Sequence, residues 1–387
     1  MKLIHLGCAW LLGTCGGMVA LGGGVKMDDY ERLRQILHKH PTGAPPSKAF
    51  QEILRTLFTA HEAHVALGMG FAPRTADRIA VLAGVAEDEA RTACESMADK
   101  GIVYARRKDG QMGYALLPTI PGIFEFPFMR GGGTPMHKRL AKLWEEYHRE
   151  GMGNEFAGSQ TPFARIVPVE QTVRSDVEVL PYEELSKLLD GVRTFALAQC
   201  ACRVSLAACD KPRDVCLVFD RTAEFLIERG LADKISRAQA DEVVRRCEEV
   251  GLVHTTSNTQ TGITFVCNCC PCCCGILRGL TQLENPNAFA RSRWRAEADP
   301  ELCIGCGTCE EERCPVAAVR VVEGLATVDA ERCIGCGLCA SACEQQAMRM
   351  LPRPQPGPEP PETVLDAGMR IAVEKGRLDE FLPLLER

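Results

Sequence analysis

The chain has 387 residues, of which 46% are hydrophobic and 25% are charged, and its net charge is −6. This length suits two or three globular domains, and the acidic balance excludes a general electrostatic attraction to nucleic acid. The 22 cysteines are unusual, because only three of them precede residue 200. Because the chain is too long for a small secreted domain, these cysteines favour metal ligation over a disulfide framework. They also favour a location in a reducing cytoplasm.

Residues 1–27 form an apolar leader. Its leucine-rich core partly fits a signal peptide, and Leu12-Gly13-Thr14-Cys15 weakly resembles a lipoprotein cleavage site. Its glycines disfavour a helix, so the stretch is a poor membrane span. We expect a mis-started leader, with translation beginning at Met18 or Met27, and a cytoplasmic protein without a transmembrane span. Membrane attachment through this segment is the alternative.

Residues 28–130 predict a domain in the order helix, turn, helix, hairpin. Apolar residues at helical spacing predict helices, and alternating residues around Asp109-Gly110 predict the two strands of a hairpin. The expected helices are Asp28–Lys39, Ser47–Thr59, Thr75–Leu82 and Glu87–Lys100, and the expected strands are Ile102–Arg107 and Met112–Leu117. This order resembles the winged helix-turn-helix of the MarR type.

The charges of this region argue against DNA binding. The second helix of such a unit normally enters the major groove, and phosphates repel acidic side chains there. Here Glu87–Lys100 carries five acidic residues against Arg91 and Lys100. The wing does carry Arg106, Arg107 and Lys108. We therefore favour protein docking or a structural role, with DNA as the disfavoured partner.

Two segments are expected to connect or dock. Residues 131–155 predict a linker helix from Pro135 to Glu150. The side chains expected on its solvated face include His137 and His148. Residues 351–387 begin with a proline-rich, extended linker and end with apolar residues at helical spacing over Val364–Leu385. This final helix is expected to dock onto the body of the protein or onto a partner.

Residues 156–285 predict a cysteine-rich α/β domain. A buried strand at Thr194–Ala198 leads into Gln199-Cys200-Ala201-Cys202-Arg203, and a strand at Thr264–Val266 leads into the run Cys267–Cys274. Two strand ends are thus expected to supply one shared site. The expected helices are Pro181–Leu189, Thr222–Arg229 and Ser236–Val250.

Ten cysteines of this domain are candidate ligands of one or two additional iron–sulfur clusters. They are Cys200, Cys202, Cys209, Cys216, Cys267, Cys269, Cys270, Cys272, Cys273 and Cys274. In an extended segment alternate side chains share a face, so Cys270, Cys272 and Cys274 are expected to point one way. A zinc site, a redox-active dithiol or disulfide, and buried structural cysteines are the alternatives.

Four other residues of this domain carry an expected role. Arg203 and Asn268 are expected to donate hydrogen bonds to cluster sulfurs, which tunes the redox potential. Cys247 is expected in the core of a helix. His254 is expected to be a satisfied surface histidine and not a ligand.

Residues 290–350 contain two runs of three cysteines at two-residue spacing. Cys303-Ile-Gly-Cys306-Gly-Thr-Cys309 is followed by Cys314, and Cys333-Ile-Gly-Cys336-Gly-Leu-Cys339 is followed by Cys343. This resembles the bacterial ferredoxin that holds two [4Fe–4S] clusters, in which the fourth cysteine of each run ligates the other cluster. The resemblance implies Cys303, Cys306, Cys309 and Cys343 as the ligands of cluster 1, and Cys333, Cys336, Cys339 and Cys314 as those of cluster 2.

Two departures affect the loops and not the ligands. Four residues separate Cys309 from Cys314, so Glu310–Arg313 is expected to form a small bulge, and Glu344 stands where proline is usual. Paired CxxC motifs also bind zinc, which is the alternative.

The expected fold is therefore α+β and multidomain. The succession of winged helix, CxCR, CNCCxCCC and ferredoxin module resembles a group of iron–sulfur proteins from anaerobic bacteria. Neither a dinucleotide fingerprint nor a Walker sequence is apparent. We expect an electron-transfer protein that works with a redox partner protein or oxidoreductase complex. The alternatives are an iron–sulfur redox enzyme whose active site lies in the cysteine-rich domain, and a redox-sensing winged-helix regulator.

Overall fold

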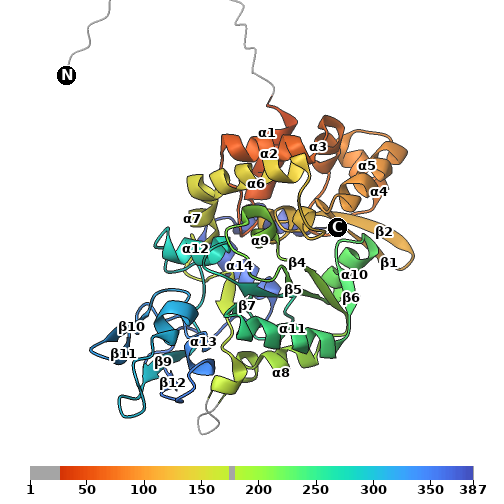
Figure 1. Cartoon of the computed structure of the whole chain (residues 1–387). Helices are drawn as coiled ribbons and strands as arrows, with labels where there is room; N and C mark the ends of the chain where they lie inside the picture. The colour runs from red at the N-terminus through yellow and green to blue at the C-terminus, as the bar shows by residue number, and fades with distance from the viewer. Residues whose placement is uncertain (1–26, 174–178, 387) are drawn as a thin grey trace, which may run out of the picture.

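Three regions follow one another in the computed structural model, which describes residues 27–173 and 179–386 (Figure 1). The expectations for the apolar leader fall on residues outside these ranges. Within them, none of the helices combines the length and the apolar content that crossing a membrane requires.

The N-terminal region consists of short helices and one hairpin. The helices are α1 (Asp29–His38), α2 (Lys48–Leu57), α3 (Ala60–Ala66), α4 (Ala76–Ala83) and α5 (Glu87–Asp99), and the antiparallel strands are β1 (Val103–Lys108) and β2 (Gln111–Leu116). Thr59 and Glu62 form a capping box that starts α3, a helix that the sequence analysis did not foresee. The other elements occur where they were expected. The winged-helix assignment itself stays a prediction.

The acidic helix α5 packs against the next region of the chain. Arg229 donates hydrogen bonds at 2.7 Å to both Glu95 and Asp99. Part of the negative charge of α5 is therefore engaged in a contact within the protein.

The expected linker helix is part of the N-terminal core. It forms α6 (Pro135–Tyr147), then a π-helical turn (His148–Met152) and α7 (Gly153–Phe156). Thr134 caps α6 by accepting a hydrogen bond from the backbone N–H of His137. Trp144 and Tyr147 are buried, and the ring of Tyr147 stacks on Phe50 of α2 at 4.5 Å.

A six-stranded antiparallel sheet forms the middle region, with strand order β3-β7-β8-β5-β4-β6. The strands are β3 (Ala164–Ile166), β4 (Phe195–Gln199), β5 (Asp214–Phe219), β6 (Asp233–Ile235), β7 (Val253–Ser257) and β8 (Phe265–Cys269). The helices are α8 (Leu185–Asp190), α9 (Ala201–Leu206), α10 (Asp220–Glu228), α11 (Arg237–Glu249) and α12 (Gly275–Thr281). The expected helix at Pro181–Leu189 is divided into a 3-10 turn (Pro181–Glu183) and α8.

Alternation along β5 shows which layers cover the sheet. Val215, Leu217 and Phe219 belong to the core that includes residues of α8 and α11. Cys216 and Val218 belong to the core of the N-terminal helices. The sheet is therefore covered on one face by α8 and α11, and on the other by the N-terminal region.

The sheet topology brings the two cysteine-bearing strand ends together. Strands β4 and β8 are both antiparallel neighbours of β5, so they run in the same direction and end at the same edge. Gln199 pairs with Asp214 at that edge, which places Cys200 there. Cys270 follows the last residue of β8. The expectation that two strand ends supply one shared place is confirmed.

The ferredoxin-type region consists of two small antiparallel sheets and a short helix. Strand β9 (Trp294–Ala298) pairs with β12 (Met348–Pro352), β10 (Val319–Val322) pairs with β11 (Leu325–Val328), and α13 (Leu338–Ser341) follows the second cysteine loop. Gly305 and Gly335 have φ values of 66° and 72°. A Cβ at Gly305 would collide with the Gly324 backbone, and one at Gly335 with Trp294.

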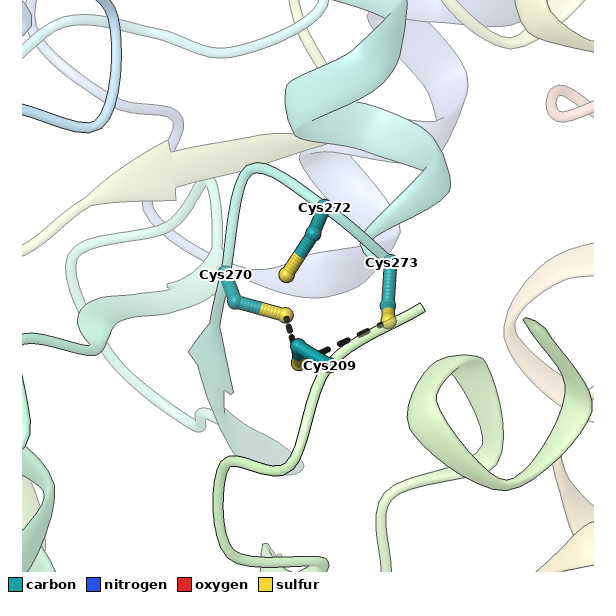
Figure 2. Close-up of side chains that lie close together, drawn as sticks. All are labelled: Cys209, Cys270, Cys272 and Cys273. Carbon is teal, nitrogen blue, oxygen red and sulfur yellow. Dashed lines mark hydrogen bonds between the residues drawn. The ribbon is translucent and has the colours of Figure 1, made fainter. Parts of the chain in front are cut away.

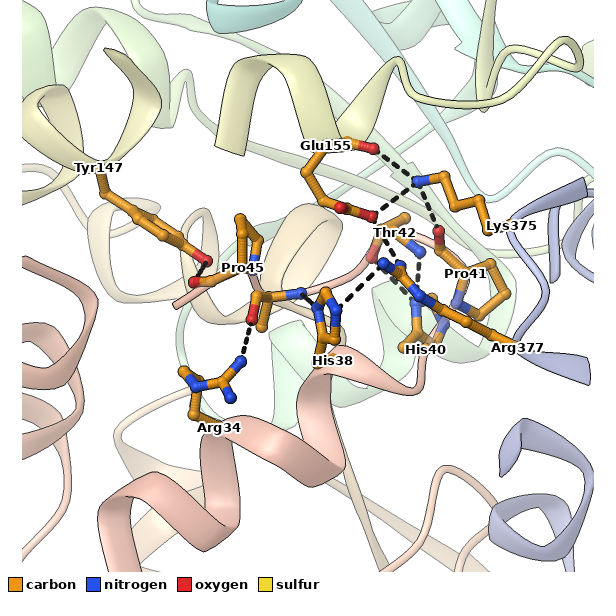
Figure 3. A network of polar contacts seen from close by, with 11 residues as sticks. Arg34, His38, His40, Pro41, Thr42, Pro45, Tyr147, Glu155, Lys375 and Arg377 are labelled. Carbon is orange, nitrogen blue, oxygen red and sulfur yellow. Dashed lines mark hydrogen bonds and ion pairs between the residues drawn. The ribbon is translucent and has the colours of Figure 1, made fainter. Parts of the chain in front are cut away.

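The C-terminal segment docks onto the N-terminal region, which confirms the first of the two expectations for it. It forms α14 (Val364–Glu374), α15 (Leu378–Phe381) and a 3-10 turn (Leu382–Leu385), with a break at Gly376 (φ 66°). Glu155 of α7 accepts hydrogen bonds from Lys375 at 3.1 Å and from Arg377 at 2.6 Å (Figure 3). The ring of Phe381 packs against His40.

Candidate metal centres

The eight ferredoxin-type cysteines surround two small cavities. Cys303, Cys306, Cys309 and Cys343 line the first, with Cys339 at its border. Cys314, Cys333, Cys336 and Cys339 line the second. The fourth cysteine of each run thus lies beside the three of the other run. This is the arrangement that the ferredoxin resemblance implies, and the assignment of ligands stays a prediction.

Backbone amides donate hydrogen bonds to the sulfur atoms of two of these cysteines. The N–H of Ala326 donates to Cys303 Sγ at 3.3 Å, and the N–H of Ala318 donates to Cys314 Sγ at 3.0 Å. Such donors stabilise thiolates and, in iron–sulfur proteins, influence the redox potential.

The two cysteine loops differ in exposure. Cys306 is exposed, and a hydrogen bond from the Thr308 backbone lowers its thiol pKa. Cys336 is buried, and burial raises its pKa to about 12. The second loop faces the middle region, because the backbone N–H of Val169 donates a hydrogen bond at 2.9 Å to the Cys336 carbonyl.

The extra residue after Cys309 also connects the ferredoxin-type region to the middle region. Cys309–Arg313 forms a π-helical turn, which is the expected bulge. Arg313 donates hydrogen bonds to the backbone carbonyls of Glu248 and Glu249 at the end of α11. A cation at that position satisfies carbonyls that the helix leaves without partners.

A cavity of about 130 Å³ lies where the cysteine-bearing strand ends meet. Its cysteine wall consists of Cys200, Cys202, Cys216, Cys267, Cys269, Cys270, Cys273 and Cys274. The facing wall comes from the N-terminal region, between Ile120 and Phe156. Arg278 of α12 and Glu145 of α6 form a bidentate ion pair at 2.7 and 2.8 Å that joins the two walls.

Six of the ten middle cysteines form a chain of interacting thiols along the cavity. Each thiol shifts the pKa of its neighbour in the order Cys216, Cys267, Cys269, Cys274, Cys202 and Cys200. The hydrogen bond with Cys202, together with burial, raises the pKa of Cys200 well above its ordinary value. The hydrogen bond with Cys216 and burial do the same for Cys267.

The other four thiols form a separate, tighter group. The Sγ atoms of Cys209, Cys270, Cys272 and Cys273 all lie within 4.8 Å of one another (Figure 2). The expectation that Cys270, Cys272 and Cys274 share a face is wrong, because residues 271–273 form a turn and not an extended strand. The turn directs Cys273 toward Cys209, while Cys274 interacts with Cys202 and Cys269.

Arg203 is a fully buried cation beside both groups of thiols. Its Nη1 donates to the carbonyl of Asn268 at 3.0 Å and to Cys270 Sγ at 3.5 Å. Its Nε and Nη2 have no hydrogen-bond partner among the described residues. Burial alone lowers the pKa of Arg203, but its interactions with Cys200 and Cys270 outweigh burial and raise that pKa.

Asn268 supports the sheet and also borders the cavity. Its amide nitrogen donates to the Val215 carbonyl at 2.7 Å, and its Oδ1 lies 2.6 Å from His254 Nδ1. His254 is only 1% exposed, so the expectation of a surface histidine is wrong, although its ring is satisfied as expected. Its Nε2 lies 3.2 Å from Glu248, at the end of α11. The prediction for Cys247 is confirmed, because its side chain is buried in α11.

The facing wall contains polar groups that the sequence analysis missed. Glu125 is partly buried, accepts a hydrogen bond from the Gly122 backbone at 2.6 Å, and has its pKa raised to about 7 by desolvation. His148, expected in solvent, lines the cavity, and burial lowers its pKa. His148 Nε2 and Trp144 Nε1 have no partner within the described ranges. No local signal marked these residues, because only the tertiary packing of the N-terminal region, with α6 against α9, brings them to the cavity.

Comparison with known proteins identifies one part of the chain. A family of 4Fe-4S binding domains matches residues 326–349. Neither a curated protein nor a solved structure matches the chain significantly. The chain therefore carries a ferredoxin-type iron–sulfur domain. The match does not extend to the cysteine-rich region beside it, so the role of that region is inferred from its geometry.

Proposed function

We propose that this chain is an iron–sulfur electron-transfer protein that works with a partner oxidoreductase and holds a further iron–sulfur cluster in the cysteine-lined cavity. When bound, such clusters take up and release single electrons. The observation that carries the proposal is the combination of eight cysteines and the fully buried Arg203 around one cavity, beside a ferredoxin-type domain.

The chemistry of the cavity wall fits an anionic sulfur-rich group. A buried guanidinium without a carboxylate is costly unless negative charge lies nearby. Within residues 27–173 and 179–386, Arg203 donates hydrogen bonds only to a carbonyl and a thiol, and two of its nitrogen atoms have no partner. Cysteine thiolates and cluster sulfides are acceptors that would satisfy those donors. The six interacting thiols would supply the iron ligands.

The difference in exposure between the two ferredoxin-type loops indicates which of them would contact a partner protein. Cys306 is exposed and Ile304 is 67% exposed, so the first loop is accessible to another protein. The second loop is buried, and its cysteines share one hydrophobic core with Cys269 and Cys274 of the middle region. The first loop is therefore the proposed contact for the partner, and the second faces the cavity.

Anaerobic quantification of iron and acid-labile sulfide tests this proposal. Two ferredoxin-type clusters alone give about eight irons per chain, and one further cubane gives about twelve. We expect about twelve in the unaltered protein and about eight in Cys202→Ser. The variant Cys94→Ala, which removes a buried thiol of the N-terminal region, serves as the control and should keep twelve. About eight irons in all three proteins would contradict the proposal.

A redox enzyme is the second candidate, favoured by the facing wall of the cavity. Glu125, His148 and Trp144 supply a partly buried carboxyl and two unpartnered nitrogen atoms there. These groups would bind a small polar substrate next to the thiols. Spin-resonance spectra of the reduced protein distinguish the candidates, because an enzyme should show a changed cluster signal when substrate is added, whereas a carrier should not.

A further inference from the structure

The four-thiol group of Cys209, Cys270, Cys272 and Cys273 differs in size from the sites around it. Cys209 Sγ lies 3.8 Å from both Cys270 Sγ and Cys273 Sγ, and the four sulfurs lie within 4.8 Å of one another. Figure 2 shows the side chains converging from two segments of the chain. No other set of three or more ligand side chains in the described ranges is gathered this closely.

These distances match the coordination shell of one metal ion. With Zn–S bonds of about 2.3 Å, a tetrahedron of four sulfurs has edges of roughly 3.8 Å. A cubane cluster places four irons and four sulfides between its thiolates, so its ligands must stand further apart. A disulfide is also excluded as a description of the group, because its S–S bond is about 2.05 Å and all four cysteines are free.

The sequence around the group agrees with a mononuclear site. Cys270 and Cys273 have the CxxC spacing that is common in structural zinc sites. Cys272 lies in the same turn, and Cys209 comes from the loop that follows α9. An ion bound by all four would fasten that loop to the turn between β8 and α12. The turn carries Cys270 and Cys273 of the cavity wall, and the loop continues from α9, which carries Cys202 of that wall.

The positive charge of Arg203 beside the group also favours a metal ion bound by four thiolates. Four thiolates around one divalent ion have a net charge of −2, and Arg203 Nη1 lies 3.5 Å from Cys270 Sγ. Because Arg203 is 0% exposed, its positive charge needs an anionic neighbour that persists in the folded protein. A tetrathiolate metal site supplies such an anion at this position.

We propose that Cys209, Cys270, Cys272 and Cys273 form a mononuclear tetrathiolate zinc site, distinct from every iron–sulfur cluster of the chain, that braces the cysteine wall of the cavity. This assignment stands independently of the electron-transfer proposal. It divides the ten middle cysteines between two tasks. Four hold a structural ion, and the six along the cavity remain for other chemistry.

The first test measures the metal in the unaltered full-length protein, purified without oxygen. We expect about one zinc per chain in addition to iron, and X-ray absorption at the zinc edge should report four sulfur ligands at about 2.3 Å. Absence of zinc would overturn the assignment, as would nitrogen or oxygen ligands at the zinc. A single iron in this site, or iron–iron scattering that disappears in Cys272→Ser, would overturn it too.

The second test uses variants. Loss of even outer-shell support typically weakens metal binding by about 10–100-fold, so Cys209→Ser and Cys272→Ser should each release zinc to a chelator at least tenfold faster than the unaltered protein. Neither residue belongs to the six-thiol chain, so iron and sulfide contents should stay unchanged. Cys247→Ala removes a buried thiol of the same region outside the group and should keep its zinc. Equal losses of zinc, iron and sulfide in Cys272→Ser would show that the four thiols belong to a cluster.

Discussion

The ferredoxin-type region and the cysteine-rich region both gather thiols, but they hold them by different means. In the first, each loop of seven residues contributes three cysteines, and positive-φ glycines such as Gly305 let the backbone close around them. In the second, the thiols come from two strand ends, a loop and a turn, and a six-stranded sheet brings those segments together.

Because the two regions hold their thiols by different means, they should tolerate different substitutions. A local loop keeps its geometry when a distant contact is lost, because the residues that shape it are neighbours in sequence. A site assembled from separate segments depends on the strand register, on buried polar contacts and on helices that pack against it. We therefore expect substitutions outside the loops to affect the cysteine-rich region selectively.

The largest expected effect is that of Arg203→Met. Removing one charge of a buried, mutually compensating set typically costs about 3–5 kcal/mol, and Arg203 is the only residue shown to donate a side-chain nitrogen to these thiols among the described residues. We expect iron to fall from about twelve to about eight per chain, with the ferredoxin-type signals retained. Iron analysis and spin resonance measure this. The exposed Arg245→Met is the control. An equal loss of iron from both regions would contradict the proposed difference between them.

The next effect is that of Glu155→Gln, which weakens the docking of the C-terminal helices. Glu155 pairs with Lys375 and Arg377, and all three side chains are mostly buried. We expect a loss of about 3 kcal/mol in the free energy of unfolding, measured by chemical denaturation. Glu380→Gln, whose carboxylate is 63% exposed and 3.7 Å from Lys39, is the matched control and should change little.

The same contact predicts a dependence on pH. Burial alone would raise the pKa of Glu155, but the hydrogen bond from Arg377 and the charge of Lys375 outweigh it and hold the pKa below 4.5. A carboxyl whose folded pKa is depressed stabilises the protein above its unfolded pKa, and loses this contribution as the pH falls through the folded value. Stability should therefore decline below about pH 4.5, with a smaller decline in Glu155→Gln. Identical pH profiles would contradict this.

A smaller effect is expected for Asn268→Leu. This change leaves the carbonyl of Val215 and Nδ1 of His254 without their partners, which typically costs about 1–3 kcal/mol. Thermal unfolding should show the loss. The spectra of the ferredoxin-type clusters should be unchanged, since the side chain of Asn268 forms its hydrogen bonds with Val215 and His254 of the middle sheet. A shift in those spectra would show that the two regions are coupled.

The smallest effect lies within the ferredoxin-type region. Cys306 is exposed, whereas Cys333, Cys336 and Cys339 are buried. During brief treatment with an oxidant followed by alkylation, Cys306 should be modified before the buried three, which mass spectrometry of peptides reads directly. Simultaneous modification of both loops would indicate that exposure does not distinguish them.

Local sequence signals predicted much of this protein. Spacing alone indicated both ferredoxin-type cysteine loops, the hairpin around Asp109-Gly110 and most helices, because these features depend on residues close in the chain. That Cys273, and not Cys274, joins Cys270 and Cys272 was not predictable in the same way. Alternation of side chains applies only to an extended segment. The turn at residues 271–273 changes the direction of the side chains, so the groups that alternation predicts do not form.

The sequence by itself determined that this chain binds iron–sulfur clusters in a ferredoxin-type region, since ligand type and spacing are local properties. Only the tertiary structure decided how the remaining cysteines are divided, that Arg203 is buried among them, and that His148 faces a cavity and not solvent. Those facts depend on strands β4 and β8 ending at one edge of a sheet and on α6 packing against α9. Such long-range contacts arise from the packing of the whole chain and leave no spacing pattern to find.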